Sequence, residues 1–479
     1  MHYEPVIGLE VHLQLNTTTK LFCGCLAKFG ALPNSQTCPV CLGLPGVLPV
    51  LNERAMEWGI RVALAVDCQM AQTMKFDRKQ YFYPDLPKNY QISQYDRPLA
   101  QHGHLDIVVD HLLKRIGITR VHLEEDAGKL LHEASQTESF VDFNRTGVPL
   151  IEIVSEPDLR SPEEAYQYLI ELKAIMEYLA VSTCNMEEGS LRCDTNVSLR
   201  VPGAAPFGAK VEVKNLNSFK AVKQALEYEI RRQAVVLDQG QRIKQETRLW
   251  DARALRTEPM RSKEEAADYR YFPEPDLVPF VIDPILIARM TDTLPELPAV
   301  RRARYQDAYQ LSAYDAQVLT QHAALGELFE GTLHAGAAPK PAANWIMGDY
   351  LAYLNANSLE PEAAKLRPEW LAHLIQLVHD GTISGKMAKD LFVQTLERGE
   401  DPRRLVEEGG LKQIVDELAL EPIAEEVLRV NQRSVEDYLK GKTTAFTHLM
   451  GQAMKLSKGK ASPQQMAVLL KRKLEQVPS

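Results

Sequence analysis

Carboxylates and one histidine lie inside strand-like apolar stretches that are far apart in the chain. Glu10 and His12 alternate with apolar residues, Glu152 interrupts the apolar run 150–154, and Asp194 begins a further alternation. A carboxylate in such a stretch must be solvated, paired or bound to a metal, because burying it alone costs too much free energy. Several carboxylates with one imidazole are typical of a Mg²⁺ or Mn²⁺ site that holds a nucleotide phosphate.

Three consecutive acids, Glu124, Glu125 and Asp126, add to this set. Adjacent residues of a strand point to opposite faces, so the three side chains cannot all converge on one site. The alternation leaves open whether Glu125 or the pair Glu124 and Asp126 faces the other carboxylates. For each strand taken singly, a polar sheet face that only meets water is the alternative interpretation.

Four of the seven cysteines form two close pairs in the pattern C-x-C-x₁₂-C-x₂-C, namely Cys23, Cys25, Cys38 and Cys41. Four thiolates at this spacing predict a tetrahedral zinc site. No ligand position remains for water, so the zinc would be structural. Four ordinary buried cysteines are the alternative. The odd total argues against a disulfide framework.

Nucleotide binding would depend on basic and aromatic side chains, because the sequence contains neither of the usual glycine-rich phosphate loops. Each such residue taken alone equally fits a solvated charge or a packed ring. The candidates are Lys75, Arg78, Lys79, Tyr81, Tyr83, Lys88, Tyr90 and Arg145. The sequence also lacks the motifs of a serine nucleophile or an amidase, so it shows no means of releasing ammonia from glutamine.

The net charge of −9 speaks against nucleic-acid binding by the chain as a whole, but the charge is unevenly distributed. From residue 429 to the C-terminus, ten Lys and Arg residues stand against three acids, a local charge of +7. This segment is the best nucleic-acid candidate, with a solvated helical face as the alternative. The candidate side chains are Lys440, Lys442, Lys455, Lys458, Lys460, Lys471, Arg472 and Lys473.

The elements that must position these residues show two different secondary-structure patterns along the chain. Residues 1–293 are predicted to be mainly strands, such as 6–15, 194–199 and 210–214, interrupted by two helices, Pro162–Ala180 and Ser218–Asp238. Ser161 is a plausible N-cap for the first of these helices. No apolar run approaches the roughly 20 residues that a membrane helix needs, and the N-terminus lacks a signal pattern, so we expect a cytoplasmic protein without membrane contact.

Beyond residue 293, Ala, Leu, Glu and Arg recur at helical spacing. We predict helices in 294–328, a loop over 331–341, a helix over 344–355, a break at Gly409-Gly410 and a basic amphipathic helix over 463–476. The prediction is therefore an α+β protein with domains 1–293, 294–407 and 408–479.

Nearly the whole chain resembles the B subunits of the tRNA-dependent amidotransferases, the Gat complexes. The C-terminal part is similar to the YqeY-like helical module through NWIMGDYLAYLN and GQAMKLSKGKASP. The N-terminal motifs that carry the resemblance are IGLEVH, CPVCLGLPG, YFYPDLPKNYQISQYD, RVHLEEDAGK, DFNRTGVPLIEIVSEPD, GSLRCDTNVSLR, EVKNLNSFKAV, QETRLWD and MRSKEEAADYRYFPEPDL.

The resemblance implies a cradle-like N-terminal domain on a mainly antiparallel sheet, an all-α domain and a YqeY-like tail. It implies that ATP phosphorylates the side-chain carboxylate of misacylated Glu-tRNA(Gln), Asp-tRNA(Asn) or both. Ammonia from a glutamine-hydrolysing A subunit would then displace the phosphate, and a C subunit would tie the A subunit to this chain.

Residue roles follow from the same resemblance. It assigns the Mg²⁺ or Mn²⁺ ligands to Glu10, His12, Glu125, Glu152 and Asp194, and so favours Glu125 among the three consecutive acids. Glu10, Glu125 and Glu152 would be catalytic, the four paired cysteines would hold structural zinc, and the basic tail would contact tRNA.

Two rivals remain at the sequence level. The archaeal paralogue, which is the E-type chain of the same superfamily, carries a large inserted domain, and the short stretch after Asp276 disfavours it here. A non-catalytic zinc-knuckle scaffold that binds RNA would leave the carboxylates in apolar strands without a purpose.

Overall fold

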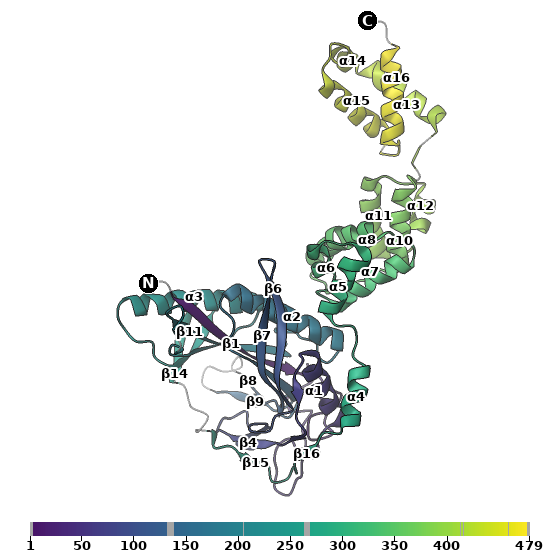
Figure 1. The fold of residues 1–479 in the computed structure, drawn as a ribbon. Helices are drawn as coiled ribbons and strands as arrows, with labels where there is room; N and C mark the ends of the chain where they lie inside the picture. Colours follow the sequence, from purple (N-terminus) through teal and green to yellow (C-terminus); the bar gives the residue numbers. More distant parts are fainter. Residues whose placement is uncertain are drawn as a thin grey trace. The chain divides into compact units, whose positions relative to one another are not determined.

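The chain divides into two compact units, Met1–Val300 and Arg301–Ser479. The computed structural model describes residues 3–131, 138–204, 206–262, 269–411, 413–414, 416–457 and 459–476. Figure 1 shows that the first unit contains the strands, whereas the second consists of helices. The protein is therefore a mixed α and β chain, as predicted from the change from strand-like to helical sequence patterns.

A nine-stranded sheet with the order β14-β13-β12-β11-β1-β10-β7-β6-β2 forms the framework of the first unit. Among the described strands, β12 and β13 pair in parallel and the other neighbours in this sheet pair antiparallel. The strands are β1 Glu4–Gln14, β2 Gln69–Met70, β6 Ala100–Val109, β7 Leu112–Glu125, β10 Pro149–Ser155, β11 Leu191–Arg200, β12 Val211–Lys214, β13 Glu246–Asp251 and β14 Arg256–Ser262.

Short strands form smaller sheets beside the large one. They are β3 Thr73–Met74, β4 Asp77–Gln80, β5 Tyr90–Ser93, β8 Lys129–Leu131, β9 Phe140–Asp142, β15 Phe272–Pro273 and β16 Phe280–Val281. Of these, β4 pairs with both β5 and β15, so residues around 77–93 lie beside residues 272–273. This pairing brings two aromatic segments of the sequence together.

Helices α2 (Pro162–Leu179) and α3 (Phe219–Asp238) pack against each other, against β6 and β11 respectively, and cover one face of the sheet (Figure 1). Both begin at a serine whose side chain accepts a hydrogen bond from the backbone three residues on, as N-caps do. On β1, Leu9, Val11 and Leu13 are 1% exposed in the core, which leaves the even-numbered side chains on the other face. The two predicted helices are confirmed.

Two further helices in this unit, α1 (Glu53–Ala65) and α4 (Pro284–Asp292), show that the prediction of only two helices was wrong. The side chain of Asn52 caps α1 by accepting from the backbone of the next turn. A glycine inside a helix lowers stability relative to alanine. Packing explains the glycine at position 59, because an added Cβ would lie 2.8 Å from the side chain of Leu99.

The second unit is helical throughout its described elements. They are α5 Pro298–Tyr309, which begins just before the boundary, α6 Ala313–Leu319, α7 Ala323–His334, α8 Pro339–Trp345, η2 Ile346–Tyr350, α9 Leu351–Asn357, η3 Pro361–Ala363, α10 Pro368–His379, α11 Gly385–Arg398, α12 Pro402–Gly409, α13 Glu417–Val430, α14 Gln432–Leu439, α15 Thr443–Leu456 and α16 Pro463–Glu475. The predicted break at Gly409-Gly410 is confirmed, because Gly410 ends α12 with a φ of +53°.

The predicted loop over 331–341 was wrong. Helix α7 continues to His334, and α8 starts at Pro339, a residue that favours the first helical position. Only the connection around Gly336, with a φ of +99°, interrupts the helices. The next stretch, η2, is a π-helix rather than an α-helix.

Three separate clusters of buried apolar side chains lie within residues 7–290, 305–406 and 420–474. The last two belong to the second unit. The division into three domains at residues 293 and 407 stays a prediction. Of the helices described, none is both long and apolar enough to cross a membrane.

Candidate active site

Strand pairing brings several polar side chains onto one face of the large sheet. Strand β1 lies between β11 and β10, so His12 is opposite Arg192 on one side and Glu152 on the other. The next strand, β7, places His122 opposite Glu152. Residues opposite each other on paired strands lie on the same face. One row across four strands therefore carries these four side chains.

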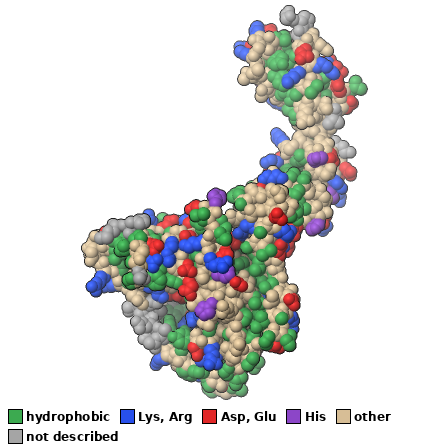
Figure 2. Space-filling model, viewed as in Figure 1, with side chains coloured by type: hydrophobic (Ala, Val, Ile, Leu, Met, Phe, Trp, Pro, Cys, Tyr) green, Lys and Arg blue, Asp and Glu red, His purple; other side chains and the backbone are tan. Residues whose placement is uncertain are grey.

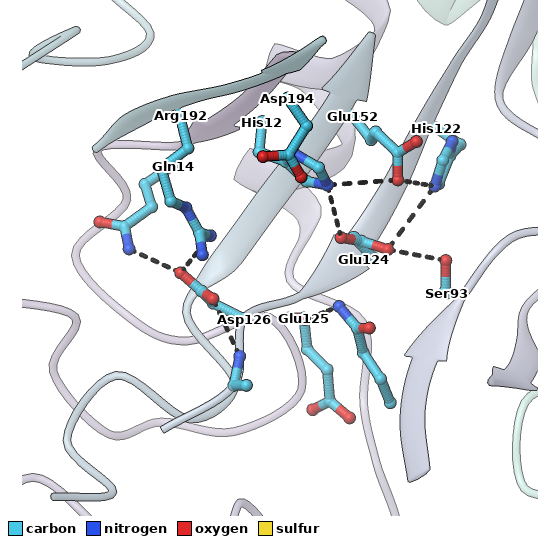
Figure 3. Close-up of polar contacts among 12 residues, drawn as sticks. His12, Gln14, Ser93, His122, Glu124, Glu125, Asp126, Glu152, Arg192 and Asp194 are labelled. Atoms are coloured by element: carbon cyan, nitrogen blue, oxygen red, sulfur yellow. Dashed lines mark hydrogen bonds and ion pairs between the residues drawn. The ribbon is translucent and has the colours of Figure 1, made fainter. Parts of the chain in front are cut away.

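His12, Glu124 and Glu152 form a compact group whose potential ligand atoms all lie within 4.8 Å of one another. His12 Nε2 is 3.4 Å from Glu152 Oε2 and 3.8 Å from Glu124 Oε1. His122 contacts the same two carboxylates, at 3.3 Å from Glu152 and 3.6 Å from Glu124. Figure 3 shows the two imidazoles on either side of the carboxylates, with Ser93 Oγ donating to Glu124 at 2.9 Å.

Opposite charges decide the protonation of this group. Burial alone would lower the pKa of His12 and His122, but the carboxylates of Glu152 and Glu124 outweigh it and raise the pKa of both histidines. Burial would likewise raise the pKa of Glu152, yet the two histidines hold it well below its usual range. Both carboxylates stay ionised and are available as oxygen ligands.

The donor set fits a hard divalent cation. Two carboxylate oxygens and one imidazole nitrogen would supply three ligands to Mg²⁺ or Mn²⁺, ions that prefer oxygen-rich ligand sets. His122 was missed by the sequence reasoning. Its spacing of two residues from Glu124 on a strand is the signal that could have found it. Its Nδ1 is buried without a hydrogen-bond partner among the described residues.

Glu10 and Asp194 lie one row away from this group and face each other across β1 and β11. Asn196 Nδ2 donates to Glu10 at 2.8 Å, and Lys214 pairs with Asp194. Both carboxylates line the same cavity as His12 and Glu152, with a volume of about 570 Å³. The structure thus brings four of the five predicted metal ligands, Glu10, His12, Glu152 and Asp194, to one cavity, while Glu10 and Asp194 stay outside the compact group.

Glu125 lies elsewhere. It pairs with Lys88, accepts a hydrogen bond from the backbone of Ile92 at 2.9 Å, and lines a different cavity of about 190 Å³ beside Cys23 and Cys41. Figure 3 shows its carboxylate pointing away from the histidines and Glu124. The expectation that Glu125 joins His12 and Glu152 therefore does not match this geometry, because neighbouring side chains on β7 point to opposite faces.

Of the described lysines in the predicted nucleotide-binding set, only Lys79 lines the large cavity. Burial would lower its pKa, but Glu124 and Glu152 outweigh it and raise the pKa of Lys79. Its Nζ lies 5.2 Å from the ring centre of Tyr269, another cavity residue. Three further cations line the cavity that were not among the predicted nucleotide-binding residues, namely Arg120, Lys210 and Lys214.

The other predicted nucleotide-binding residues have other partners. Lys75 pairs with Asp77 at 2.9 Å and Asp96 at 2.6 Å, and Arg145 donates to the backbone oxygens of Ala127 and Gly128. Lys88 pairs with Glu125, as described. The aromatic and remaining basic members also lie outside the lining of the large cavity: Tyr81 packs edge-on against Tyr269, Tyr83 is exposed, and Tyr90 stacks under Arg78.

The four paired cysteines meet as predicted. Ligand atoms of Cys23, Cys25, Cys38 and Cys41 all lie within 4.8 Å of one another, which fits the tetrahedral thiolate set of structural zinc. A hydrogen bond from the Cys23 thiol lowers the pKa of Cys41 to about 4. Lys20 Nζ lies 3.6 Å from the same sulfur and also favours the thiolate.

The basic tail is less uniformly positive than its sequence window indicates. Acids of α13, which precede residue 429, pair with α16: Lys473 contacts Glu421 and Glu425 at 2.8 Å. Figure 2 shows Lys, Arg, Asp and Glu side chains mixed on the visible face of this segment. The other predicted tail residues divide as follows: Lys440, Lys442 and Arg472 contact acids, Lys460 donates to a backbone oxygen, Lys455 and Lys471 are exposed, and Lys458 lies outside the described residues.

Comparisons with known proteins identify the family of the chain. A family described as the GatB/GatE catalytic domain matches residues 5–288, and the GatB domain that carries the YqeY label matches residues 327–474. Three relatives are each named as the B subunit of an aspartyl/glutamyl-tRNA(Asn/Gln) amidotransferase. They are from Moorella thermoacetica (55% identical over 476 residues, 99% of this chain and 100% of the relative), Carboxydothermus hydrogenoformans (54% over 475 residues, 98% and 99%) and Acaryochloris marina (52% over 483 residues, 99% and 98%). The chain belongs to the family of aspartyl/glutamyl-tRNA amidotransferase B subunits.

Proposed function

We propose that this chain uses ATP to activate the side-chain carboxylate of misacylated Glu-tRNA(Gln), Asp-tRNA(Asn) or both for conversion into the amide. A carboxylate at neutral pH is an anion and a poor electrophile, so it needs activation before nitrogen can attack. The observation that carries the proposal is the compact group of His12, Glu124 and Glu152, of which His12 and Glu152 line the cavity of about 570 Å³ together with Lys79. The names of the relatives supply the tRNA substrates.

The reaction has two steps. An oxygen of the substrate carboxylate attacks the γ-phosphorus of ATP, the bond to the ADP oxygen breaks, and an acyl phosphate forms. Ammonia then attacks the acyl carbon, inorganic phosphate leaves with the electrons of the broken bond, and the nitrogen loses a proton to give the amide. Phosphoryl transfer needs positioned charge more than covalent help from the protein.

The residues of the cavity have the charges for these steps. His12, Glu124 and Glu152 would hold Mg²⁺ or Mn²⁺, which when bound neutralises phosphate charge. Lys79 donates to the transferred phosphoryl group, since it points into a cavity that burial makes less polar than water. Glu10 and Asp194 act one row away, where they orient Asn196 and Lys214 toward the phosphates.

The remaining parts of the proposal concern the assembly. An A subunit would supply ammonia from glutamine and a C subunit would join the A subunit to this chain, because the sequence lacks an amidase motif. The zinc site would stabilise the knuckle of residues 23–41, and the helices after residue 407 would bind the body of the tRNA. A cradle domain, a helical domain and a YqeY-like tail would carry these roles.

ADP formation tests the proposal. The chain is assembled with its A and C partners, and ADP is measured with ATP and Glu-tRNA(Gln) but without glutamine or ammonia. Wild type should form ADP only with the misacylated tRNA, and Glu152→Gln should lower the rate at least about 100-fold. The matched control is Glu156→Gln, whose carboxylate accepts from Thr119 outside the cavity lining and should leave the rate within about twofold.

Other outcomes are equally informative. If Glu152→Gln forms ADP at the wild-type rate, the carboxylate group is not the phosphoryl-transfer site. If wild type forms no ADP with or without ammonia while still binding tRNA, the chain is a non-catalytic RNA-binding scaffold.

A further inference from the structure

A buried hydroxyl group forms part of the wall of the charged cavity. Thr247 is 1% exposed, and its Oγ1 donates a hydrogen bond to Glu212 Oε2 at 2.8 Å. One wall of the cavity of about 570 Å³ comes from β12, β13 and the residue before each strand, namely Lys210, Glu212, Lys214, Gln245 and Thr247. Neither Thr247 nor Glu212 has a role in the two reaction steps proposed above.

The pairing of β12 with β13 holds these two side chains together. The strands run parallel, with Glu212 opposite Thr247. The next residue of β13, Arg248, points to the opposite face, where its Nε lies 3.1 Å from Glu229 Oε1 of α3. Glu229 is fully buried and also accepts hydrogen bonds from Arg232. Buried ion pairs on the helix side therefore anchor the strand that carries Thr247.

The carboxylate of Glu212 has a different partner at each oxygen. Its Oε2 accepts from Thr247, whereas its Oε1 lies 3.5 Å from Lys214 Nζ. Lys214 also pairs with Asp194 of β11, and its side chain is 31% exposed. Burial would lower the pKa of Lys214, but Asp194 and Glu212 outweigh it and raise that pKa. The ammonium group is therefore charged and held between two carboxylates of neighbouring strands.

Loss of the Thr247 hydroxyl would change how Glu212 pairs. A glutamate side chain has several rotatable bonds, and a hydrogen bond from a buried hydroxyl restricts it to one orientation. Without that donor, Glu212 Oε2 would turn toward the Lys214 ammonium, which already lies 3.5 Å from Oε1. A pair that uses both oxygens would hold the ammonium against the wall and reduce its attraction for a phosphate.

We propose that Thr247 is a positioning residue of the phosphoryl-transfer site, which acts through Glu212 to keep the Lys214 ammonium available to the polyphosphate of ATP. The inference rests on the proposed function, because the polyphosphate is that of the same ATP. Thr247 itself touches neither the phosphates nor the reacting atoms. Its effect is on the direction of a lysine that lines the cavity.

Binding of inorganic tripolyphosphate to the full assembly measures this effect apart from the chemistry. Thr247→Val keeps the shape of the side chain but removes the hydroxyl, so it should raise the Kd of tripolyphosphate about tenfold. Thr247→Ser keeps the hydroxyl and should leave that Kd within about twofold of wild type. Thr195→Val on β11 is the matched control, because Thr195 is fully buried and its Oγ1 has no hydrogen-bond partner among the described residues. It should leave the Kd unchanged.

A double variant separates positioning from a structural role. Lys214→Met alone should raise the Kd of tripolyphosphate more than Thr247→Val does, because it removes the cation itself. If Thr247 acts through this lysine, the addition of Thr247→Val to Lys214→Met should produce no further rise, whereas independent effects would multiply. A general loss of stability would instead weaken binding in both backgrounds, together with a lower unfolding temperature.

Three results would overturn the assignment. A Kd in Thr247→Val equal to that of wild type would mean that the hydroxyl does not position Lys214. Effects that multiply in the double variant would mean that Thr247 does not act through the lysine. A Kd of Mn²⁺ that rises in Thr247→Val as much as that of tripolyphosphate would mean that Glu212 serves the ion.

The proposed function fails in a different measurement. Wild type that binds tripolyphosphate but forms no ADP would overturn that function, while the binding data still decide the role of Thr247. Wild type that forms ADP but shows the same tripolyphosphate binding as Lys214→Met would overturn the inference alone.

Discussion

Glu124 and Glu125 are adjacent in sequence but have different partners: Glu124 contacts His12 and His122, whereas Glu125 pairs with Lys88. Their isosteric replacements should therefore change different properties of the protein. Glu124→Gln removes one of the two anionic ligands in the group with His12 and Glu152. The attraction between a cation and one carboxylate amounts to several kcal/mol even at an effective dielectric constant of about 20. We therefore expect the Kd of Mn²⁺ to rise at least about 100-fold, or about 2.7 kcal/mol.

Glu125→Gln should spare the metal and lower stability instead. The Glu125 and Lys88 side chains are 3% and 8% exposed, so the substitution leaves a buried ammonium group without its counter-charge. Breaking such a pair from one side costs about 3–5 kcal/mol of unfolding free energy. The Kd of Mn²⁺ should stay within about threefold of wild type, because the Glu125 carboxylate points away from the histidines (Figure 3).

Two measurements on the same purified variants decide between these effects. Mn²⁺ binding is followed by electron paramagnetic resonance of the free ion, and stability by thermal unfolding without metal. Loss of Mn²⁺ binding in Glu125→Gln, with binding retained in Glu124→Gln, would refute the assignment of the two faces of β7. Loss of binding in both, with equal unfolding temperatures, would mean that both carboxylates reach the ion.

Three further predictions concern other parts of the chain. Purified protein should contain zinc, and Cys41→Ser should abolish it and lower the unfolding temperature, as metal analysis and thermal unfolding will show. Glu229 is fully buried, and although burial raises its pKa, Arg232 and its other partners hold that pKa below the usual value. Its contribution is present at neutral pH and lost as pH falls through the lowered pKa, so the stability deficit of Glu229→Gln, about 3 kcal/mol at pH 7, should shrink below pH 4 in urea titrations. Deletion of Val435–Ser479 should weaken tRNA binding and reduce its salt dependence, and an unchanged affinity across salt concentrations would contradict a role for the tail.

Local sequence signals predicted much of the secondary structure. Helices α2 and α3 begin at Ser161 and Ser218, whose capping side chains are visible in the sequence. Helix α1 was missed because Gly59 weakens its helical pattern. A side chain at position 59 would collide with Leu99, which is far away in sequence, so the sequence pattern alone does not explain this glycine. The loop predicted over 331–341 is wrong for the reverse reason: glycine and proline favour loops, yet Gly331 lies inside α7 and Pro339 starts α8.

A count of charges over a sequence window likewise misses contacts that the fold makes with residues outside the window. The count of +7 starts at residue 429 and so omits α13, whose Glu421 and Glu425 contact Lys473 in the fold. Pairing of this kind on an exposed surface is weak and is screened by salt, so it does not remove the attraction to phosphate. It does mean that Lys455 and Lys471, which are exposed, should contribute more to tRNA binding than the sequence count alone indicates.

The site itself depends on long-range pairing that no single strand encodes. Alternation on β1 puts Glu10 and His12 on one face, but the strands beside it lie about 140 and 180 residues away along the chain. Only their register decides that His12 meets Glu152 and that His122 joins from β7. A shift by one residue in any of these pairings would turn every side chain of that strand to the other face, so the candidate ion site depends on this register.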